Sequence, residues 1–320
     1  AMTTGNSVLT TSIGALAILN QLITMGSLIA TNMLGGRMVS PLIQLVGQWR
    51  TFGQFRAAKK RLDTLLSAPQ DRSESVIALP RPVGAMRLES VTFQFPGSEN
   101  ALLEPISGEI GPSGLHAIVG PNGSGKTTLL KILRGLYPPS TGRVLIDGAD
   151  LHQFTQTELA QRIGYLSQTN QLLSTSIRDN IALANPDASD EQIIRAAERS
   201  CAHHFIIDLP DGYATQVGEG AQRFSAGQTK RIAIAQALLN DPPVLLLDEP
   251  TAELDRESEL RFVQTLKQLA KERTVIVVTH SPFLLSHCNG ILVMNKGKLM
   301  AAGPATEILP KLGMNVASNA

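Results

Sequence analysis

The sequence has few cysteines, and its first 61 residues contain no aspartate or glutamate. Two cysteines, Cys201 and Cys288, are too few for a disulfide scaffold, and they form no Cys-x-x-Cys pair. This excludes a disulfide-stapled fold and argues against a redox function. Both are expected to be reduced, cytosol-facing core residues.

The charge of the chain is unevenly distributed, although its formal net charge is only +1. Residues 1–61 carry six basic side chains and no acidic one, which leaves 22 of the 28 basic residues against 27 acidic residues in the rest. An uncharged, then basic, stretch is thus followed by a mildly acidic body. This excludes a whole-chain basic nucleic-acid binder, and the acidic body argues against a nucleic-acid partner.

The first 36 residues carry no charged side chain, and Arg37 is the only charge before Arg50. About 20 apolar residues span a bilayer. The stretch 22–47 therefore predicts one membrane helix, and 8–20 predicts a second helix or the end of one. The basic residues from 50 to 61 predict that this end faces the cytoplasm. Arg37 at membrane depth predicts partner helices around it. A buried soluble helix pair is the alternative.

From residue 83 onward, strand-like and helix-like patterns alternate, which is typical of an α/β domain. The predicted organisation is a partial transmembrane region at 1–66, a linker at 67–82, an α/β domain at 83–310 and a tail at 311–320. The predicted strands cover 87–95, 116–119, 144–147, 244–247 and 274–278. The predicted helices cover 127–135, 158–161, 189–202 and 226–239.

One segment has the pattern of a phosphate-binding loop, Gly-x-x-x-x-Gly-Lys-Thr, between a predicted strand and a predicted helix. Its glycines let backbone N–H groups surround phosphate oxygens at a helix N-terminus. Lys126 is expected to reach the β- and γ-phosphates, and Thr127 to offer its hydroxyl to Mg²⁺. We therefore predict an ATP site formed by Gly120, Pro121, Asn122, Gly123, Ser124, Gly125, Lys126, Thr127 and Thr128.

An apolar strand at 244–247 ends in two adjacent acids, Asp248 and Glu249. Side chains at a strand end diverge, so the two carboxylates can take different tasks. Asp248 is expected to hold Mg²⁺ through water, and Glu249 to polarise the attacking water.

Taken together, residues 87–309 resemble the ATP-binding cassette (ABC) ATPases of the exporter class. Residues 224–228 (FSAGQ) resemble the LSGGQ signature, and Gln168 resembles the glutamine of the Q-loop. Residues 252–255 resemble the D-loop, His280 resembles the H-switch, and Phe95 resembles the aromatic residue that stacks on adenine. The resemblance implies a P-loop domain with a RecA-like core, an antiparallel β subdomain and an α-helical subdomain, preceded by a partial transmembrane segment.

The resemblance also implies roles for these residues in an ATPase. Glu249, His280, Lys126 and Gln168 would be catalytic, and Thr127, Gln168 and Asp248 would serve the metal. A second ABC subunit, in a homodimer or a heterodimer, would close on the ATP. The further nucleotide-binding residues implied are Phe95, Ser225, Ala226, Gly227, Gln228 and Asp255.

Residues 22–44 and 61–63 resemble the last membrane helix and elbow of type I secretion exporters. This implies a bacterial inner-membrane location with the ATPase on the cytoplasmic face. It also implies a secreted protein substrate, a periplasmic adaptor and an outer-membrane channel. The family's half-transporters have six spans, so the others are expected from a longer chain or a partner. A soluble or regulatory ABC ATPase and a peptide or lipid exporter are the alternatives.

The sequence departs from the family pattern at several positions. Ala226 replaces a signature glycine, Phe224 replaces leucine, Phe95 replaces tyrosine, and Glu253 alters the D-loop. Phe95 keeps the π face and loses only a hydroxyl. The expected enzyme is a competent ATPase whose rate the added methyl of Ala226 can lower.

Overall fold

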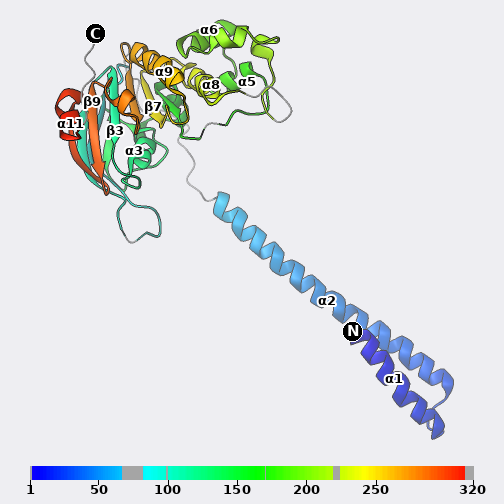
Figure 1. Cartoon of the computed structure of the whole chain (residues 1–320). Coiled ribbons are helices and arrows are strands. Elements are labelled where there is room, and N and C mark those ends of the chain that lie inside the picture. The colour runs from blue at the N-terminus through cyan, green and yellow to red at the C-terminus, as the bar shows by residue number, and fades with distance from the viewer. Residues whose placement is uncertain (1, 67–81, 99, 170, 219–223, 314–320) are drawn as a thin grey trace. The chain divides into compact units, whose positions relative to one another are not determined.

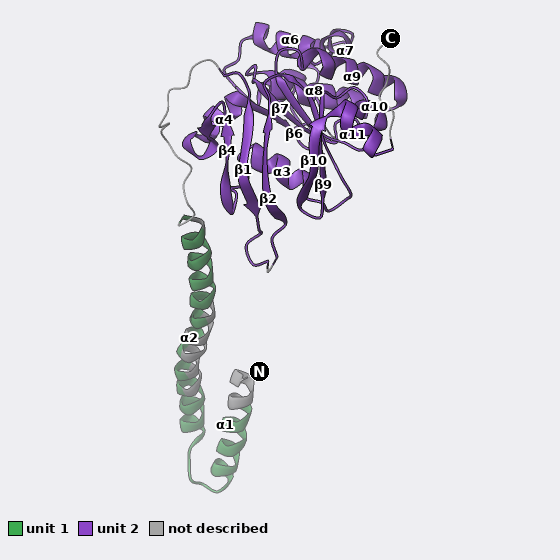
Figure 2. Ribbon diagram, turned by 90° about the vertical axis from the view of Figure 1, so that its left-hand side faces the viewer, with its two compact units in different colours: residues 1–70 green, residues 71–320 purple. Residues whose placement is uncertain are grey.

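The structure is a computed structural model that describes residues 2–66, 82–98, 100–169, 171–218 and 224–313. It divides into two compact units, residues 1–70 and 71–320 (Figure 2). The first unit is a pair of helices, α1 (Met2–Leu19) and α2 (Met25–Leu66). Gly14 of α1 lies so close to Leu28 that an added Cβ would be 2.1 Å from Leu28 Cδ1. Asn32 Nδ2 also donates to Thr11 Oγ1 at 3.0 Å, so the two helices pack directly.

The boundaries predicted for these helices are wrong. Residues 20–24 form a turn, with Gln21 in the left-handed region at φ 59°, where the expected membrane helix 22–47 was to begin. Within the described part of the chain, no helix combines the length and the apolar character needed to cross a membrane. Seven polar residues lie in the first two-thirds of α1, and Asn32, Arg37 and Gln44 interrupt the apolar stretch of α2.

The second unit contains a six-stranded sheet in the order β10-β9-β3-β8-β7-β6. The strands from β9 to β6 pair in parallel, and β10 pairs antiparallel with β9. Every residue of β7 and β8 is buried, as expected for parallel strands covered on both faces. The six strands are β3 (Gly114–Val119), β6 (Ile163–Leu166), β7 (Val244–Asp248), β8 (Thr274–Val278), β9 (Gly290–Asn295) and β10 (Lys298–Pro304).

A separate antiparallel sheet has the order β2-β1-β4-β5. Its strands are β1 (Met86–Phe93), β2 (Leu103–Ile110), β4 (Thr141–Ile146) and β5 (Ala149–Asp150). The buried faces of both sheets and of α3 (Lys126–Leu133) share one core, which includes Val91, Ile118, Leu130 and Leu246. This core fixes the antiparallel sheet beside the helix that follows the phosphate loop.

Several helices share a further core, and the last of them also packs against the parallel sheet (Figure 1). They are α5 (Ile177–Ala182), α6 (Asp190–Arg199), α7 (His203–Ile207) and α8 (Ala226–Leu238). The remaining helices are α4 (Gln156–Arg162), α9 (Arg256–Leu269), α10 (Pro282–Leu285) and α11 (Ala305–Lys311). A mainly parallel core, an antiparallel sheet and a helical subdomain are therefore all present, which confirms the predicted α/β fold class.

Two smaller expectations have different outcomes. Cys288 is buried as expected, but Cys201 is exposed, because it follows α6 in a left-handed turn at φ 56°. Both thiols are free. The predicted linker at 67–82 and tail at 311–320 lie mostly outside the described residues, so those boundaries stay predictions.

Candidate nucleotide site

The phosphate loop joins β3 to α3 through a backbone that requires glycine. Gly120 has φ 153°, and an added Cβ would lie 2.0 Å from the carbonyl oxygen of Met294 on β9. Gly125 is the N-cap of α3 at φ 95°, and no side chain caps the helix. The first N–H groups of a helix lack intrahelical acceptors. Those of Lys126, Thr127 and Thr128 therefore face the loop as donors for an anion.

Lys126 is folded back into this loop. Its Nζ donates to the carbonyl oxygens of Gly120 at 2.8 Å and Pro121 at 3.0 Å, and the residue is 7% exposed. Burial lowers the pKa of Lys126, while the carboxylates of Glu249 and Asp248 oppose that shift. The ammonium group is thus held at the loop by carbonyl groups that a phosphate can replace.

Thr127 and Asp248 meet at the end of β7. The Thr127 hydroxyl donates to Asp248 Oδ1 at 3.3 Å. The other carboxylate oxygen, Oδ2, is buried and has no hydrogen-bond partner among the described residues. Burial raises the pKa of Asp248, against the lowering effect of Thr127. An unpaired buried carboxylate oxygen beside a hydroxyl is the type of oxygen donor set that Mg²⁺ takes, so these residues fit the metal.

Glu249 and His280 follow adjacent parallel strands and face each other. Glu249 has φ 48°, and its N–H donates to the carbonyl of Val278 on β8 at 2.9 Å. Its Oε1 lies 3.5 Å from His280 Nε2. Burial raises the pKa of Glu249, and His280 is the largest opposing influence. The Glu249 carboxylate can accept a proton from a water molecule that approaches it beside His280.

Gln168 and Phe95 lie at two other edges of the site. Gln168 is exposed two residues after β6, whose end pairs with the end of β7 through Leu166 and Leu247. Phe95 is 43% exposed just after β1, and its ring meets Phe93 edge-on with centroids 4.9 Å apart. Phe95 thus presents a supported ring face, as adenine stacking requires.

The segment that resembles the signature begins α8. Ser225 is the N-cap, with Ser225 Oγ accepting from Gln228 N at 3.2 Å and Gln228 Oε1 accepting from Ser225 N at 3.0 Å. Asp255 is the N-cap of α9, with its Oδ1 accepting from Ser258 N at 2.9 Å. Among the described residues, no hydrogen bond or ion pair joins Ser225–Gln228 to the phosphate loop. The structure therefore brings Lys126, Thr127, Asp248, Glu249 and His280 together, and Ser225, Ala226, Gly227, Gln228 and Asp255 form a second group around α8 and α9.

Two residues near these groups were not predicted. Tyr137 stacks on Phe93 with centroids 5.4 Å apart and supports the aromatic cluster at Phe95. Lys230 is 6% exposed, and its Nζ donates to the carbonyl of Ala252. Its only sequence signal is its place directly before Arg231 and the apolar run 232–235 of α8.

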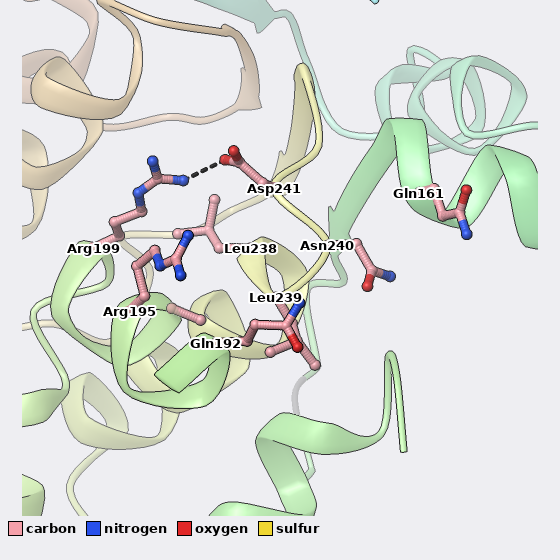
Figure 3. A pocket seen from close by; sticks show the side chains of 9 residues that line it. Gln161, Gln192, Arg195, Arg199, Leu238, Leu239, Asn240 and Asp241 are labelled. Atoms are coloured by element: carbon pink, nitrogen blue, oxygen red, sulfur yellow. Dashed lines mark hydrogen bonds and ion pairs between the residues drawn. The ribbon is translucent and has the colours of Figure 1, made fainter. Parts of the chain in front are cut away.

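A separate cavity of about 290 Å³ lies near the start of β7 and is drawn in Figure 3. It contains an ion pair between Arg199 of α6 and Asp241, and Arg273 also donates to Asp241 at 3.0 Å. Burial raises the pKa of Asp241, but the two guanidinium groups outweigh it and leave the pKa below its usual range. No predicted site residue lines this cavity, and its Arg199–Asp241 ion pair joins α6 to the segment before β7.

The comparisons with known proteins agree with the motifs. Residues 103–252 match the family model described as ABC transporter. The toxin RTX-I translocation ATP-binding protein of Actinobacillus pleuropneumoniae is 38% identical over 302 residues, covering 94% of this chain and 43% of the relative. The alpha-hemolysin translocation ATP-binding protein HlyB of Escherichia coli is 39% identical over 297 residues, covering 93% of this chain and 42% of the relative.

Among solved structures, a bacterial Atm1-family ABC exporter with ATP bound superposes with a TM-score of 0.72 at 31% identity. The match covers 91% of this chain and 51% of that one. The chain spans less than half the length of the two curated relatives described above. It carries an ABC transporter domain and is a homologue of translocation ATP-binding proteins.

Proposed function

We propose that this chain binds ATP with Mg²⁺ and hydrolyses it as the ATP-binding part of an exporter. The observation that carries the proposal is the convergence of a phosphate loop, a buried carboxylate and a carboxylate–histidine pair at one end of parallel strands. Lys126 lies more than 100 residues before Asp248 and Glu249 in the chain, yet its charge interacts with both carboxylates. Phosphoryl transfer depends mainly on such positioned charges.

Each residue of the site has a separate task in this proposal. Lys126 and the N–H groups at the start of α3 bind phosphate oxygens, and Phe95 stacks on the adenine. Thr127, Asp248 and Gln168 would hold Mg²⁺. When bound, Mg²⁺ supplies positive charge that neutralises the phosphates. Glu249 accepts a proton from the attacking water, and His280 orients that water beside Glu249 Oε1.

The signature residues complete the site in a dimer of ABC subunits, either two copies or two related chains. Ser225, Ala226 and Gly227 of one subunit would close on the phosphates held by the other subunit. Helix α8 supports this assignment, because its N-terminus is rigidly capped by Ser225 and Gln228. Asp255 at the start of α9 would contact the partner next to it.

The exported material is proposed to be a secreted protein. The support is the similarity to translocation ATP-binding proteins named for RTX-I toxin and alpha-hemolysin. By this analogy the chain acts at the bacterial inner membrane, with its ATPase domain on the cytoplasmic face. A periplasmic adaptor and an outer-membrane channel would be its partners, and a longer chain or a partner would supply the membrane helices.

Phosphate release from MgATP by the purified chain tests the enzymatic part. We expect hydrolysis by the native chain and loss of ATP binding in Lys126→Ala, because the cation that offsets the phosphate charge is removed. The control is Lys311→Ala on α11, which should match the native chain. Equal ATP affinity in Lys126→Ala and native protein would contradict the proposal.

A further inference from the structure

Lys230 is a buried cation that none of the proposed steps uses. It lies on α8 two residues after Gln228 and is 6% exposed. Burial of an ammonium group is costly unless a polar group compensates it. Its Nζ donates to the carbonyl oxygen of Ala252. Ala252 belongs to the loop 249–255, so this bond ties the loop to the signature helix.

The loop 249–255 is tightly wound and links Glu249 to Asp255. Glu249 and Glu253 both have left-handed backbone, at φ 48° and φ 67°. Non-glycine residues stay in that region only where their surroundings hold them. Within the loop, Ala252 N donates to the Glu249 carbonyl at 3.2 Å. A displacement of Ala252 would therefore be passed directly to Glu249.

The first turn of α8 also packs against the end of this loop. A Cβ at Gly227 would lie 3.5 Å from Leu254 Cδ2 and 3.7 Å from Ser258 Oγ, which is ordinary van der Waals contact. Ser258 is the residue through which Asp255 caps α9. The loop thus lies close to the backbone of Gly227 and is bonded by Lys230 from the same helix.

The charges around Lys230 favour its ammonium form. Burial lowers the pKa of Lys230, and the carboxylates of Glu253 and Glu249 oppose that shift. The ammonium group therefore lies within the electrostatic field of Glu249 while it donates to Ala252. The hydrogen bond and the electrostatic attraction both act on the same loop.

We propose that Lys230 is a positioning residue for ATP hydrolysis. Its bond to the Ala252 carbonyl fixes the loop 249–255 on α8, and this sets the place of the Glu249 carboxylate. A movement of the Ser225 end of α8 then reaches Glu249 through Lys230. The inference rests on the proposed hydrolysis at Glu249.

The test compares Lys230→Met, which removes the donor, with Lys230→Gln, which keeps an N–H donor at the end of the side chain. We expect kcat to fall about tenfold in Lys230→Met, the effect of one lost charge-assisted hydrogen bond, with the KM for ATP unchanged. Lys230→Gln should recover part of kcat. Lys267→Met, on the exposed side of α9, is the matched control and should equal the native chain.

The inference is overturned if Lys230→Met keeps kcat within twofold of the native value, or if Lys230→Gln is as slow as Lys230→Met. Should Lys230→Met fail to fold, the kcat and KM of Lys230→Ala, which also removes the donor, decide. A fall in kcat alone supports the inference, and no change overturns it. Absence of phosphate release by the native chain would contradict the proposed function, and this role of Lys230 with it.

Discussion

Oε1 of Glu249 lies 3.5 Å from Nε2 of His280, and the two residues follow neighbouring strands, β7 and β8. The distance is set by backbone pairing, because Asp248 lies opposite Val278 and Glu249 N donates to the Val278 carbonyl. Glu249 is mostly buried, whereas the His280 side chain is 51% exposed. The mostly buried carboxylate of Glu249, the proposed base, therefore faces the more exposed side chain of His280. Water can approach the carboxylate from the His280 side.

The acid limb of the pH profile tests this pair. Burial raises the pKa of Glu249, and only the ionised carboxylate accepts a proton. We expect kcat to fall as pH drops through a pKa above the ordinary value of about 4.3. In His280→Ala the lowering influence of His280 is lost, so the limb should move to higher pH. A limb that stays in place or moves to lower pH in this variant would contradict the assignment.

The unpaired Oδ2 of Asp248 predicts dependence on Mg²⁺. Asp248→Asn keeps the shape of the side chain but removes the charge that would serve the metal. The Mg²⁺ concentration for half-maximal hydrolysis should rise more than about tenfold, since one charge-assisted interaction is lost. The exposed Asp187→Asn is the control and should leave the Mg²⁺ titration unchanged. The same Mg²⁺ requirement in both variants would remove Asp248 from the metal site.

The close approach of Gly120 to the Met294 carbonyl predicts that a larger residue at position 120 would distort the phosphate loop. In Gly120→Ala the new Cβ would lie 2.0 Å from the Met294 carbonyl oxygen, at a φ of 153°. The variant should lose more than about 1 kcal/mol of unfolding free energy and bind ATP more weakly. Gly108→Ala is the matched change, because nothing lies within 4 Å of its added Cβ. Denaturant unfolding and ATP titration of both variants check this, and equal behaviour would contradict it.

The exposed ring of Phe95 predicts an effect on adenine binding. Phe95→Ala removes the stacking face, which contributes about 1–3 kcal/mol per base in comparable contacts. The dissociation constant for ATP should rise at least about fivefold. Phe95→Tyr keeps the face and should bind ATP as the native chain does. An unchanged dissociation constant in Phe95→Ala would place the adenine elsewhere.

The sequence predicts the parts of the site that depend on local chain order. The phosphate loop needs only a strand, its glycines and a helix in succession, and Lys126 and Thr127 follow from that pattern. Asp248 and Glu249 are likewise marked by the apolar strand before them. His280 follows another apolar strand, so the sequence also predicts that it lies just after the end of a buried strand.

The parts that depend on contacts between distant segments could not be predicted in this way. That β8 lies between β3 and β7 is a matter of long-range pairing. The burial of Lys230 depends on the Ala252 carbonyl, 22 residues further along. Strand β2 was missed because its buried and exposed residues do not alternate, and β10 because it is rich in small residues. The turn at 20–24 was missed because the flanking residues are apolar on both sides.

Phosphate release by Glu249→Gln is the most direct test of catalysis by this site. The variant keeps the shape of the side chain but cannot act as a base, so it should bind MgATP with native affinity and retain it unhydrolysed. Turnover should fall by at least about 100-fold, as expected when a general base is removed. Phosphate release by Glu249→Gln at the rate of the native chain would contradict the central role assigned to Glu249.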